Sequence, residues 1–219
     1  MKIKYILPAT ALFFLSSCGS NNSAQKDEPG TQEQEILDEN CTYSFNPEAT
    51  EIRWTAYKTT DKIAVTGVFD EFIIDGVKAS ANNPAGLFKS AKFDIKTYTV
   101  NSGNAERDPK LVEFFFKQMD TPESISGKVL NMSDPVNGKG TAELEVTMNN
   151  IAQKVMTEYT LSNDTIHLFT EIDMATWNAI HAANKLNEVC KVLHTGADGV
   201  SKLWPTVRME IKSALKKDC

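Results

Sequence analysis

The sequence predicts an all-β domain built from antiparallel strands. From Thr42 onward, apolar and polar residues alternate in one run after another, as in Glu51–Ala56 and Thr141–Met148. Such alternation is typical of strands with one buried and one solvated face, which occur in antiparallel sheets. Turn signals such as Asn137-Gly138 separate the runs. Eight or nine short strands in one domain must close into a barrel or pair into a sandwich, and alternation alone does not choose between the two.

The strands can be placed in order along the chain from this alternation. Every second residue is predicted to face inward, so an error of one position would exchange the two faces of a strand. The predicted segments or inward faces are Thr42–Phe45, Ile52/Trp54/Ala56, Ala64–Ile74, Ala91/Phe93/Ile95, Ile125–Leu130, Leu144/Val146, Val155/Thr157/Tyr159, Ile166/Leu168/Thr170/Ile172 and Val207/Met209/Ile211.

A short helix is predicted where the alternation first breaks. Asp108-Pro109 is typical of a helix start, because Asp accepts hydrogen bonds from free N–H groups and Pro fits the first turn. The helix runs into Phe114-Phe115-Phe116, and three adjacent rings cannot all face one side of it. We expect these rings to plug one end of the core, to contact a ligand, or to do both.

A second helix is predicted near residues 176–194. Leu186, Val189, Cys190 and Leu193 recur at the spacing of one helical face, so this helix presents an apolar stripe. We expect it to lie across the sheet.

The first forty residues resemble the N-terminus of a bacterial lipoprotein. Two lysines precede the apolar run Tyr5–Leu15, which is too short to span a bilayer, and Leu15-Ser16-Ser17-Cys18 follows as a lipobox-like site. We expect residues 1–17 to be a signal peptide, Cys18 to be lipidated, and residues 18–40 to be a polar tether about 26 Å in root-mean-square span. The folded domain, residues 41–219, would then be anchored in the cell envelope, facing the periplasm or the cell surface.

Composition and motifs exclude several function classes. The net charge is −6 and no basic run exceeds Lys216-Lys217, which argues against a nucleic-acid partner. Neither a Gly-x-Ser-x-Gly elbow nor a Gly-rich phosphate loop is present. The sequence therefore offers no arrangement that favours catalysis, and we expect a protein that is not an enzyme.

The three cysteines that follow Cys18 allow one disulfide and one free thiol. Cys41 begins the first strand and Cys219 lies just past the last one. If these strands are antiparallel neighbours that close a barrel, their ends meet. We therefore predict a Cys41–Cys219 disulfide, with Cys190 buried on its helix.

A metal or haem site is the alternative interpretation of Cys190. Cys190 and His194 lie one helical turn apart, and His181 lies upstream, so together they could bind zinc or a haem iron. Zinc requires three or four ligands, and the sequence supplies no further Cys/His cluster. We therefore expect no metal, and a redox protein that uses Cys190, His194 and His181 stays the second hypothesis.

One segment resembles the hallmark of the YceI-like family of lipid-binding barrels. Asn101–Phe115 follows a strand and contains an Asn-type turn, the pair Arg107-Asp108, then Leu111 and two aromatic residues. Val65–Phe72 and Gly140–Val155 resemble two further hairpin segments of that family. The segment between Ile172 and Trp204 departs from the family's compact pattern.

The resemblance implies a lipocalin-like barrel of eight antiparallel strands that holds an isoprenoid-like or other long-chain lipid, such as a polyprenol or an isoprenoid quinone. No cofactor besides that ligand is implied. A ligand-free interaction barrel with a solid core is the third hypothesis. The predicted ligand contacts are Trp54, Phe69, Phe93, Ile95, Phe114, Phe115, Phe116, Leu144, Val146, Tyr159, Leu168, Met209 and Ile211.

The residues of the hallmark turn are assigned structural roles. We expect Asp108 to cap the helix, Asn104 to hold the turn through its side chain, and Arg107 to tie the turn to a neighbouring strand end. A second interpretation of Arg107 is contact with a polar head group at the barrel mouth.

Overall fold

The computed structural model describes residues 40–219, and the predicted signal peptide, Cys18 and nearly all of the tether lie outside the described residues. The strands are β1 (Thr42–Ser44), β2 (Thr50–Lys58), β3 (Ile63–Phe69), β4 (Phe72–Asp75), β5 (Lys92–Lys96), β6 (Val100–Asn101), β7 (Ser124–Met132), β8 (Lys139–Met148), β9 (Ile151–Ser162), β10 (Thr165–Asp173), β11 (Leu203–Ala214) and β12 (Lys216–Asp218). The helices are α1 (Pro84–Phe88), α2 (Asp108–Phe114), α3 (Ile180–Val189) and α4 (Lys191–His194), with short 3₁₀ turns η1 (Pro47–Ala49), η2 (Thr97–Thr99), η3 (Phe116–Gln118) and η4 (Met174–Trp177).

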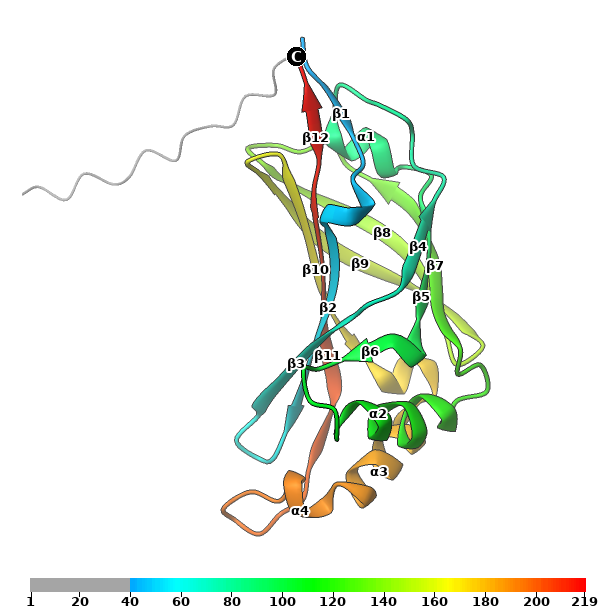
Figure 1. The fold of residues 1–219 in the computed structure, drawn as a ribbon, viewed down its shortest axis with the longest axis vertical. Coiled ribbons are helices and arrows are strands. Elements are labelled where there is room, and N and C mark those ends of the chain that lie inside the picture. Colours follow the sequence, from blue (N-terminus) through cyan, green and yellow to red (C-terminus); the bar gives the residue numbers. More distant parts are fainter. Residues whose placement is uncertain (1–39) are drawn as a thin grey trace, which may run out of the picture. The chain divides into compact units, whose positions relative to one another are not determined.

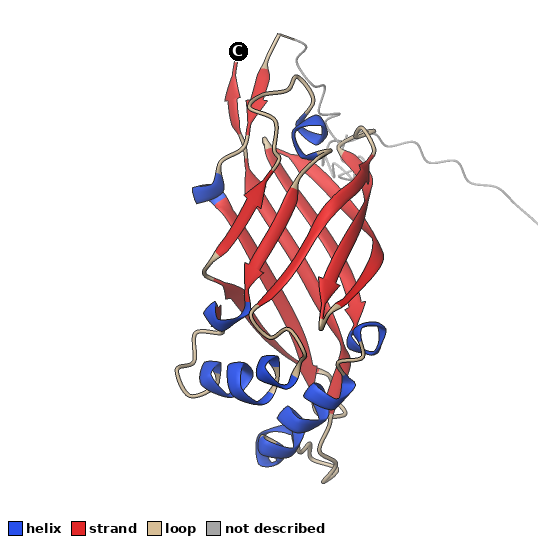
Figure 2. Cartoon of the chain, turned by 90° about the vertical axis from the view of Figure 1, so that its right-hand side faces the viewer, coloured by secondary structure: helices blue, strands red, loops and turns tan. Residues whose placement is uncertain are grey.

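Ten of the strands form one curled antiparallel sheet in the order β4-β5-β7-β8-β9-β10-β11-β2-β3-β6. In Figure 2 the strands of the near wall and those of the far wall are inclined in opposite directions, as the tilted strands of a barrel are when it is viewed from the side. Because β11 pairs with β2, the last long strand lies beside the first. The predicted antiparallel β-barrel class is confirmed.

Two of the barrel positions are each formed by two short strands, so the ten strands occupy eight positions. The predicted strand Ala64–Ile74 is broken at Asp70 and Glu71 into β3 and β4. Both break residues still bond to the next position, since Asp70 N–H donates to the Thr99 carbonyl (3.1 Å) and the Glu71 carbonyl accepts from Lys96 N–H (3.0 Å). The segment between β3 and β4 therefore stays hydrogen-bonded to the neighbouring strand position of the barrel.

Cross-strand glycines let two large aromatic rings lie flat against the wall. Gly67 pairs with Trp54, and a Cβ at Gly67 would come within 2.5 Å of the indole ring. Gly127 pairs with Phe93, where a Cβ would approach the ring to 2.4 Å. A ring that packs over a glycine lies close to the sheet and does not project toward the barrel axis, which leaves room inside the barrel.

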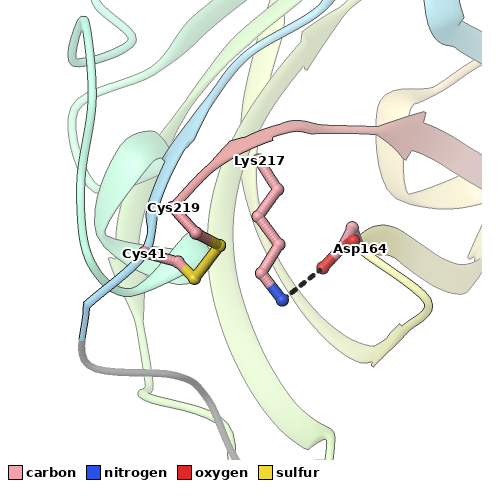
Figure 3. Close-up of a disulfide and its surroundings, with 4 residues drawn as sticks. All are labelled: Cys41, Asp164, Lys217 and Cys219. Carbon is pink, nitrogen blue, oxygen red and sulfur yellow. Dashed lines mark ion pairs between the residues drawn. A yellow bond between two sulfur atoms is a disulfide. The ribbon is translucent and has the colours of Figure 1, made fainter.

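The end of the domain that holds both chain ends of the folded part is tightly closed. Cys41 and Cys219 form a disulfide beside the small β1–β12 pair, as the strand order predicted, and Lys217 lies 3.8 Å from Asp164 (Figure 3). Cys190 is free and buried, also as predicted. A buried apolar cluster fills the barrel at this end and consists of Tyr43, Ala85, Leu87, Met132, Ala142, Leu144, Tyr159, Leu161, Ile166 and Leu215.

The helices α2, α3 and α4 cover the opposite end of the barrel, at the bottom of Figure 1. The predicted helix near residues 176–194 is divided into η4, α3 and α4, with breaks at Asn178 and Cys190. Because the helix breaks at Cys190, its predicted apolar stripe is not continuous: Leu186 and Cys190 are buried, whereas Val189 and Leu193 are exposed. Within residues 40–219, no helix is both long and apolar enough to cross a bilayer.

Candidate functional site

A cavity of about 300 Å³ lies inside the barrel at the end covered by the helices. Its walls are the inward faces of strands from every side of the sheet, so it occupies the barrel axis and not a gap between two elements. The strand residues that line it are Trp54, Ala56, Tyr57, Lys58, Val65, Phe69, Val100, Ile125, Met148, Ile172, Leu203, Val207 and Met209. Apart from Tyr57 and Lys58 at the end of β2, this lining is apolar, which suits a hydrocarbon.

The helices close this cavity with apolar side chains. Phe115 and Phe116 reach it from the end of α2, and Leu186 and Cys190 reach it from α3 and its C-terminal boundary. Phe116 contacts Phe69 edge-on at 6.1 Å between centroids and Phe115 at 5.0 Å. These ring contacts fix the α2 cover to strand β3.

The hallmark turn places polar side chains at the cavity. Asn104 Oδ1 accepts hydrogen bonds from the backbone N–H groups of Glu106 and Arg107, each at 3.0 Å. This turn is the one predicted for Asn104. Asp108 Oδ1 accepts from the backbone N–H of Ser102 at 2.9 Å and from its hydroxyl. The turn is thereby held on both sides.

Two predicted roles in this turn are wrong. Asp108 is the first residue of α2, not its cap, and its carboxylate bonds to Ser102 because the preceding chain passes within reach. Arg107 does not tie the turn to a strand end, since among residues 40–219 its guanidinium forms neither an ion pair nor a hydrogen bond. Arg107 instead lines the cavity, which leaves the head-group interpretation as the standing prediction.

The polar lining residues carry more positive than negative charge. Lys58, Arg107 and Lys110 line the cavity together with Glu106 and the amide of Asn104. The apolar walls lie deeper, on the strands. A ligand with a long apolar tail and a polar or anionic head matches this division of the surface.

His194 lies at the cavity as a neutral imidazole. Its Nδ1 lies 2.9 Å from Asn187 Oδ1, and because an amide oxygen can only accept, Nδ1 carries the proton; the same oxygen lies 3.3 Å from the Ser201 hydroxyl, which donates to it. Burial, together with the nearby Lys58 charge, lowers the pKa of His194 to about 4. The thiol of Cys190 is buried against the same cavity.

The structure does not bring together the three side chains of the metal or haem hypothesis. Cys190 and His194 line the cavity, but the ring nitrogens of His181 contact the carbonyl oxygens of Asn178 and Gln118 elsewhere. Among the described residues, no group of three or more His, Cys, Asp or Glu side chains could hold a metal ion. Two ligands alone do not make a zinc site.

The predicted ligand-contact residues divide into four sets. Trp54, Phe69, Phe115, Phe116 and Met209 line the cavity of about 300 Å³. Phe93, Leu144, Leu168 and Ile211 line a second cavity of about 70 Å³, further along the barrel toward the disulfide end. Ile95, Val146 and Tyr159 lie in the packed core, in neither cavity. Phe114 is half-buried and lines neither cavity.

Several cavity residues escaped the sequence-based prediction. Met148 continues the alternation of Leu144 and Val146, and Val207 was predicted to face inward but was not named as a ligand contact, so that signal was sufficient to find both. Leu186 and Lys58 carried no such signal. Their position depends on how α3 lies across the barrel and where β2 ends, which strand periodicity does not determine.

Comparison with known proteins decides the family. The family model described as YceI-like domain matches residues 43–213, which is most of the chain. The chain belongs to the YceI-like family. Among solved structures, Burkholderia cenocepacia BcnA aligns with a TM-score of 0.56 and 12% identity, covering 80% of this chain and 100% of that one.

A second similar structure is a polyisoprenoid binding domain from Saccharophagus degradans. It aligns with a TM-score of 0.53 and 14% identity, covering 81% of this chain and 98% of that one. At these identities, the likeness shows the YceI-like fold. No curated protein matches the chain.

Proposed function

We propose that this protein binds the apolar chain of an isoprenoid-like lipid inside its barrel and performs no catalysis. The observation that carries the proposal is the apolar cavity of about 300 Å³ on the barrel axis, closed by α2 and α3. Membership of the YceI-like family supports it, as does the fold shared with a domain described as polyisoprenoid binding. The ligand would be a polyprenol or an isoprenoid quinone.

The cavity is large enough for useful affinity. A water molecule has a share of about 30 Å³ in the liquid, and a methylene group is of similar size, so the cavity holds about ten carbon atoms. At about 0.8 kcal/mol per buried methylene, ten of them give a gross gain of about 8 kcal/mol before the entropy costs of binding. Because a dissociation constant of about 1 μM needs a net gain of about 8 kcal/mol, a ten-carbon chain should bind more weakly than that, and a longer chain that buries more methylenes should bind more tightly.

A longer chain would extend along the barrel axis. Trp54 and Met209 line the larger cavity, and Ile52 and Ile211, the next inward positions of the same strands, lie toward the smaller one. The two cavities are therefore consecutive along β2 and β11. Small movements of these four side chains would join them, and the tail of a longer lipid would follow this path.

Membrane anchoring belongs to the same proposal. A lipidated Cys18 would hold the domain at a membrane of the bacterial cell envelope through a tether about 26 Å in span. A carrier or store for a membrane lipid needs to stay close to its source, and a tether of this kind keeps it there.

A binding titration tests the proposal. Delipidated full-length protein is titrated with prenols of increasing length, with the intrinsic tryptophan fluorescence as readout, since Trp54 lines the cavity. We expect saturable binding of one lipid per chain, and affinity that rises with chain length until the cavity is full.

Two matched variants give the titration its specificity. Ala56→Phe fills the cavity from β2, whereas Ala152→Phe places the same ring on an exposed position of β9. The first variant should lose prenol binding and the second should keep it. Equal binding by both variants, or no binding by the wild type at any chain length, contradicts the proposal.

A further inference from the structure

Exposed aliphatic side chains gather at the helix end of the barrel. Val192 on α4 is 88% exposed and its neighbour Leu193 is 59% exposed. Val189 at the end of α3, Val200 in the loop after α4, and Ile63 at the start of β3 are also exposed. We call these five residues the apolar tip. Exposed apolar groups this close together mark an interaction surface.

The parts of the apolar tip are fixed to one another by hydrogen bonds. The backbone N–H of Thr59, in the β2–β3 hairpin, donates to the carbonyl of Lys202 at 2.8 Å. In the same hairpin, the Thr60 hydroxyl donates to Asp198 Oδ2 at 2.7 Å. The hairpin and the loop that follows α4 therefore form one surface.

Lysines flank the apolar tip. The Nζ atoms of Lys62 and Lys202 lie 4.3 and 3.5 Å from the ring centroid of Trp204, whose indole N–H donates to the Thr59 carbonyl at 2.7 Å. Lys191 is exposed on α4. The two ring contacts hold positive charge beside the tip in a protein whose net charge is −6.

Three acidic residues lie near the apolar tip. Glu188 forms an ion pair with Lys185 at 3.0 Å, Asp198 accepts the Thr60 hydrogen bond and keeps its charge, and Asp61 is exposed in the hairpin turn. The four lysines Lys62, Lys185, Lys191 and Lys202 outnumber these acids by one. The charge at the tip is therefore slightly positive, opposite in sign to that of the whole chain.

The apolar tip is continuous with the cavity. Leu193 belongs to both, since it is exposed and also lines the cavity. Arg107 and Lys110 line the same cavity. A lipid that leaves the barrel past Leu193 would thus meet aliphatic side chains first and cations beside them.

We propose that the apolar tip docks on the surface of a bilayer that contains anionic lipid, and that lipid passes there between the bilayer and the cavity. Protruding aliphatic side chains beside lysines match the chemistry of a membrane interface, where apolar groups insert and cations contact anionic head groups. The tip lies at the opposite end of the barrel from Cys41, where the chain from the predicted tether enters the domain (Figure 1). The second part of the proposal, lipid passage, rests on the proposed function.

Vesicle sedimentation tests the docking surface. The full chain carries Cys18→Ser in all samples, so that no acyl chain can be attached and every sample shares the same N-terminal segment. Vesicles consist of phosphatidylcholine alone or mixed with phosphatidylglycerol. We expect binding to the anionic vesicles that weakens at high salt, and about tenfold weaker binding after Val192→Asp with Val200→Asp.

A control carries a single Val→Asp change at the other end of the barrel, and is compared with the single Val192→Asp variant as well as with the double variant. Val136 is 72% exposed in the β7–β8 turn, next to Asp134, which bonds to Asn83 at the start of α1. Val136→Asp should bind vesicles as the wild type does. Lys62→Gln with Lys202→Gln should reduce the preference for phosphatidylglycerol and the dependence on salt.

The outcomes separate this proposal from the proposed function. Val192 and Val200 do not line the cavity, so prenol binding in detergent should be unchanged in that variant. Absence of vesicle binding by the wild type overturns the docking surface, as does equal binding by the Val192/Val200 and Val136 variants. Binding of the tip to a protein partner and not to vesicles would also overturn it. A wild-type protein that binds the anionic vesicles but binds no prenol overturns the proposed function instead.

Discussion

The two ends of this barrel differ in how tightly they are packed and in which side chains they expose. The disulfide end is filled by a buried apolar cluster, leaves a cavity of only about 70 Å³, and joins the two termini of the folded domain covalently. The helix end contains a cavity of about 300 Å³, a cover of short helices, and cations beside exposed aliphatic side chains. The helix end has a buried cluster of its own, which includes Trp54, Phe69, Phe116 and Trp177, but this cluster surrounds a cavity instead of filling the barrel.

The difference teaches how one sheet supports both properties. The same strands, β2 and β11 among them, run from one end to the other with inward apolar residues throughout. At the disulfide end, Tyr159 is buried and donates its hydroxyl hydrogen to the Ser133 carbonyl at 2.6 Å. Burial raises the pKa of Tyr159 to about 12, so this hydrogen bond persists at any physiological pH.

Removing the disulfide should have the largest effect on stability. The bond closes a loop with a sequence separation of 178, and loss of such a constraint costs about 3–5 kcal/mol, chiefly through the unfolded state. We expect Cys41→Ser with Cys219→Ser to lower the free energy of unfolding in urea by this amount. Prenol affinity of the folded variant should not change. A variant as stable as the wild type would show that the disulfide does not stabilise the domain. A variant that folds but has lost prenol binding would show that the two ends are not independent.

Two Leu→Ala substitutions compare the packing of the two ends. Leu87 is fully buried at the disulfide end, so Leu87→Ala should cost about 3 kcal/mol by leaving a new void. Leu111 is half-buried and already borders the cavity, so Leu111→Ala should cost about 1 kcal/mol. Urea unfolding of both variants measures the difference. Equal losses would mean that the two ends are packed alike.

Gly67→Ala tests whether the flat position of Trp54 keeps the cavity open. The added Cβ would lie 2.5 Å from the indole ring and 2.6 Å from the Asn101 carbonyl oxygen, so the ring must move toward the cavity. We expect a loss of about 1–3 kcal/mol in stability and at least tenfold weaker prenol binding. Gly86→Ala in α1, where the nearest atom would be 3.6 Å away, is the control and should change neither quantity unfavourably. Unchanged prenol binding in the Gly67 variant would contradict this role of the glycine.

His194 should make the helix end sensitive to acid. Its pKa is about 4 when folded and about 6.5 when unfolded, so the unfolded state binds the proton more readily. Stability from the neutral imidazole is complete above pH 6.5 and is lost as the pH falls toward 4, by about 3 kcal/mol from the two pKa values and by about 2 kcal/mol once solvent screening of the ring is allowed for. His194→Gln keeps a donor toward Asn187 but does not titrate in this range. Between neutral pH and pH 4, the unfolding free energy of the wild type should therefore fall by more than that of the variant, and parallel curves would exclude this effect.

The sequence was sufficient for the strands and for much of the cavity wall. Alternation placed Trp54 and Met209 on the inward face because a strand has a period of two whatever surrounds it, and Phe69 came from alternation together with the family resemblance. The Cys41–Cys219 disulfide also followed, because it depends only on which strands are neighbours. These features are local or topological, and a single sequence encodes both.

The cover of the cavity was less predictable, because it depends on tertiary packing. Arg107 was expected at a strand end and lines the cavity, since the direction of its side chain is set by how the Asn104 turn docks. The break at Cys190 exposes Val189 and Leu193, although both fit the apolar stripe of one continuous helix. Periodicity identifies a helix but does not show where tertiary contacts interrupt it.

Native mass spectrometry tests the central claim, that the helix end holds the apolar chain of a lipid, most directly. The full chain is purified from membranes in a mild detergent and weighed intact beside the Ala56→Phe variant. The account predicts a wild-type protein carrying one additional mass that matches an isoprenoid-like lipid, and a variant that lacks it. A wild-type protein without any bound lipid, which also takes up none when polyprenol is supplied, would contradict the account.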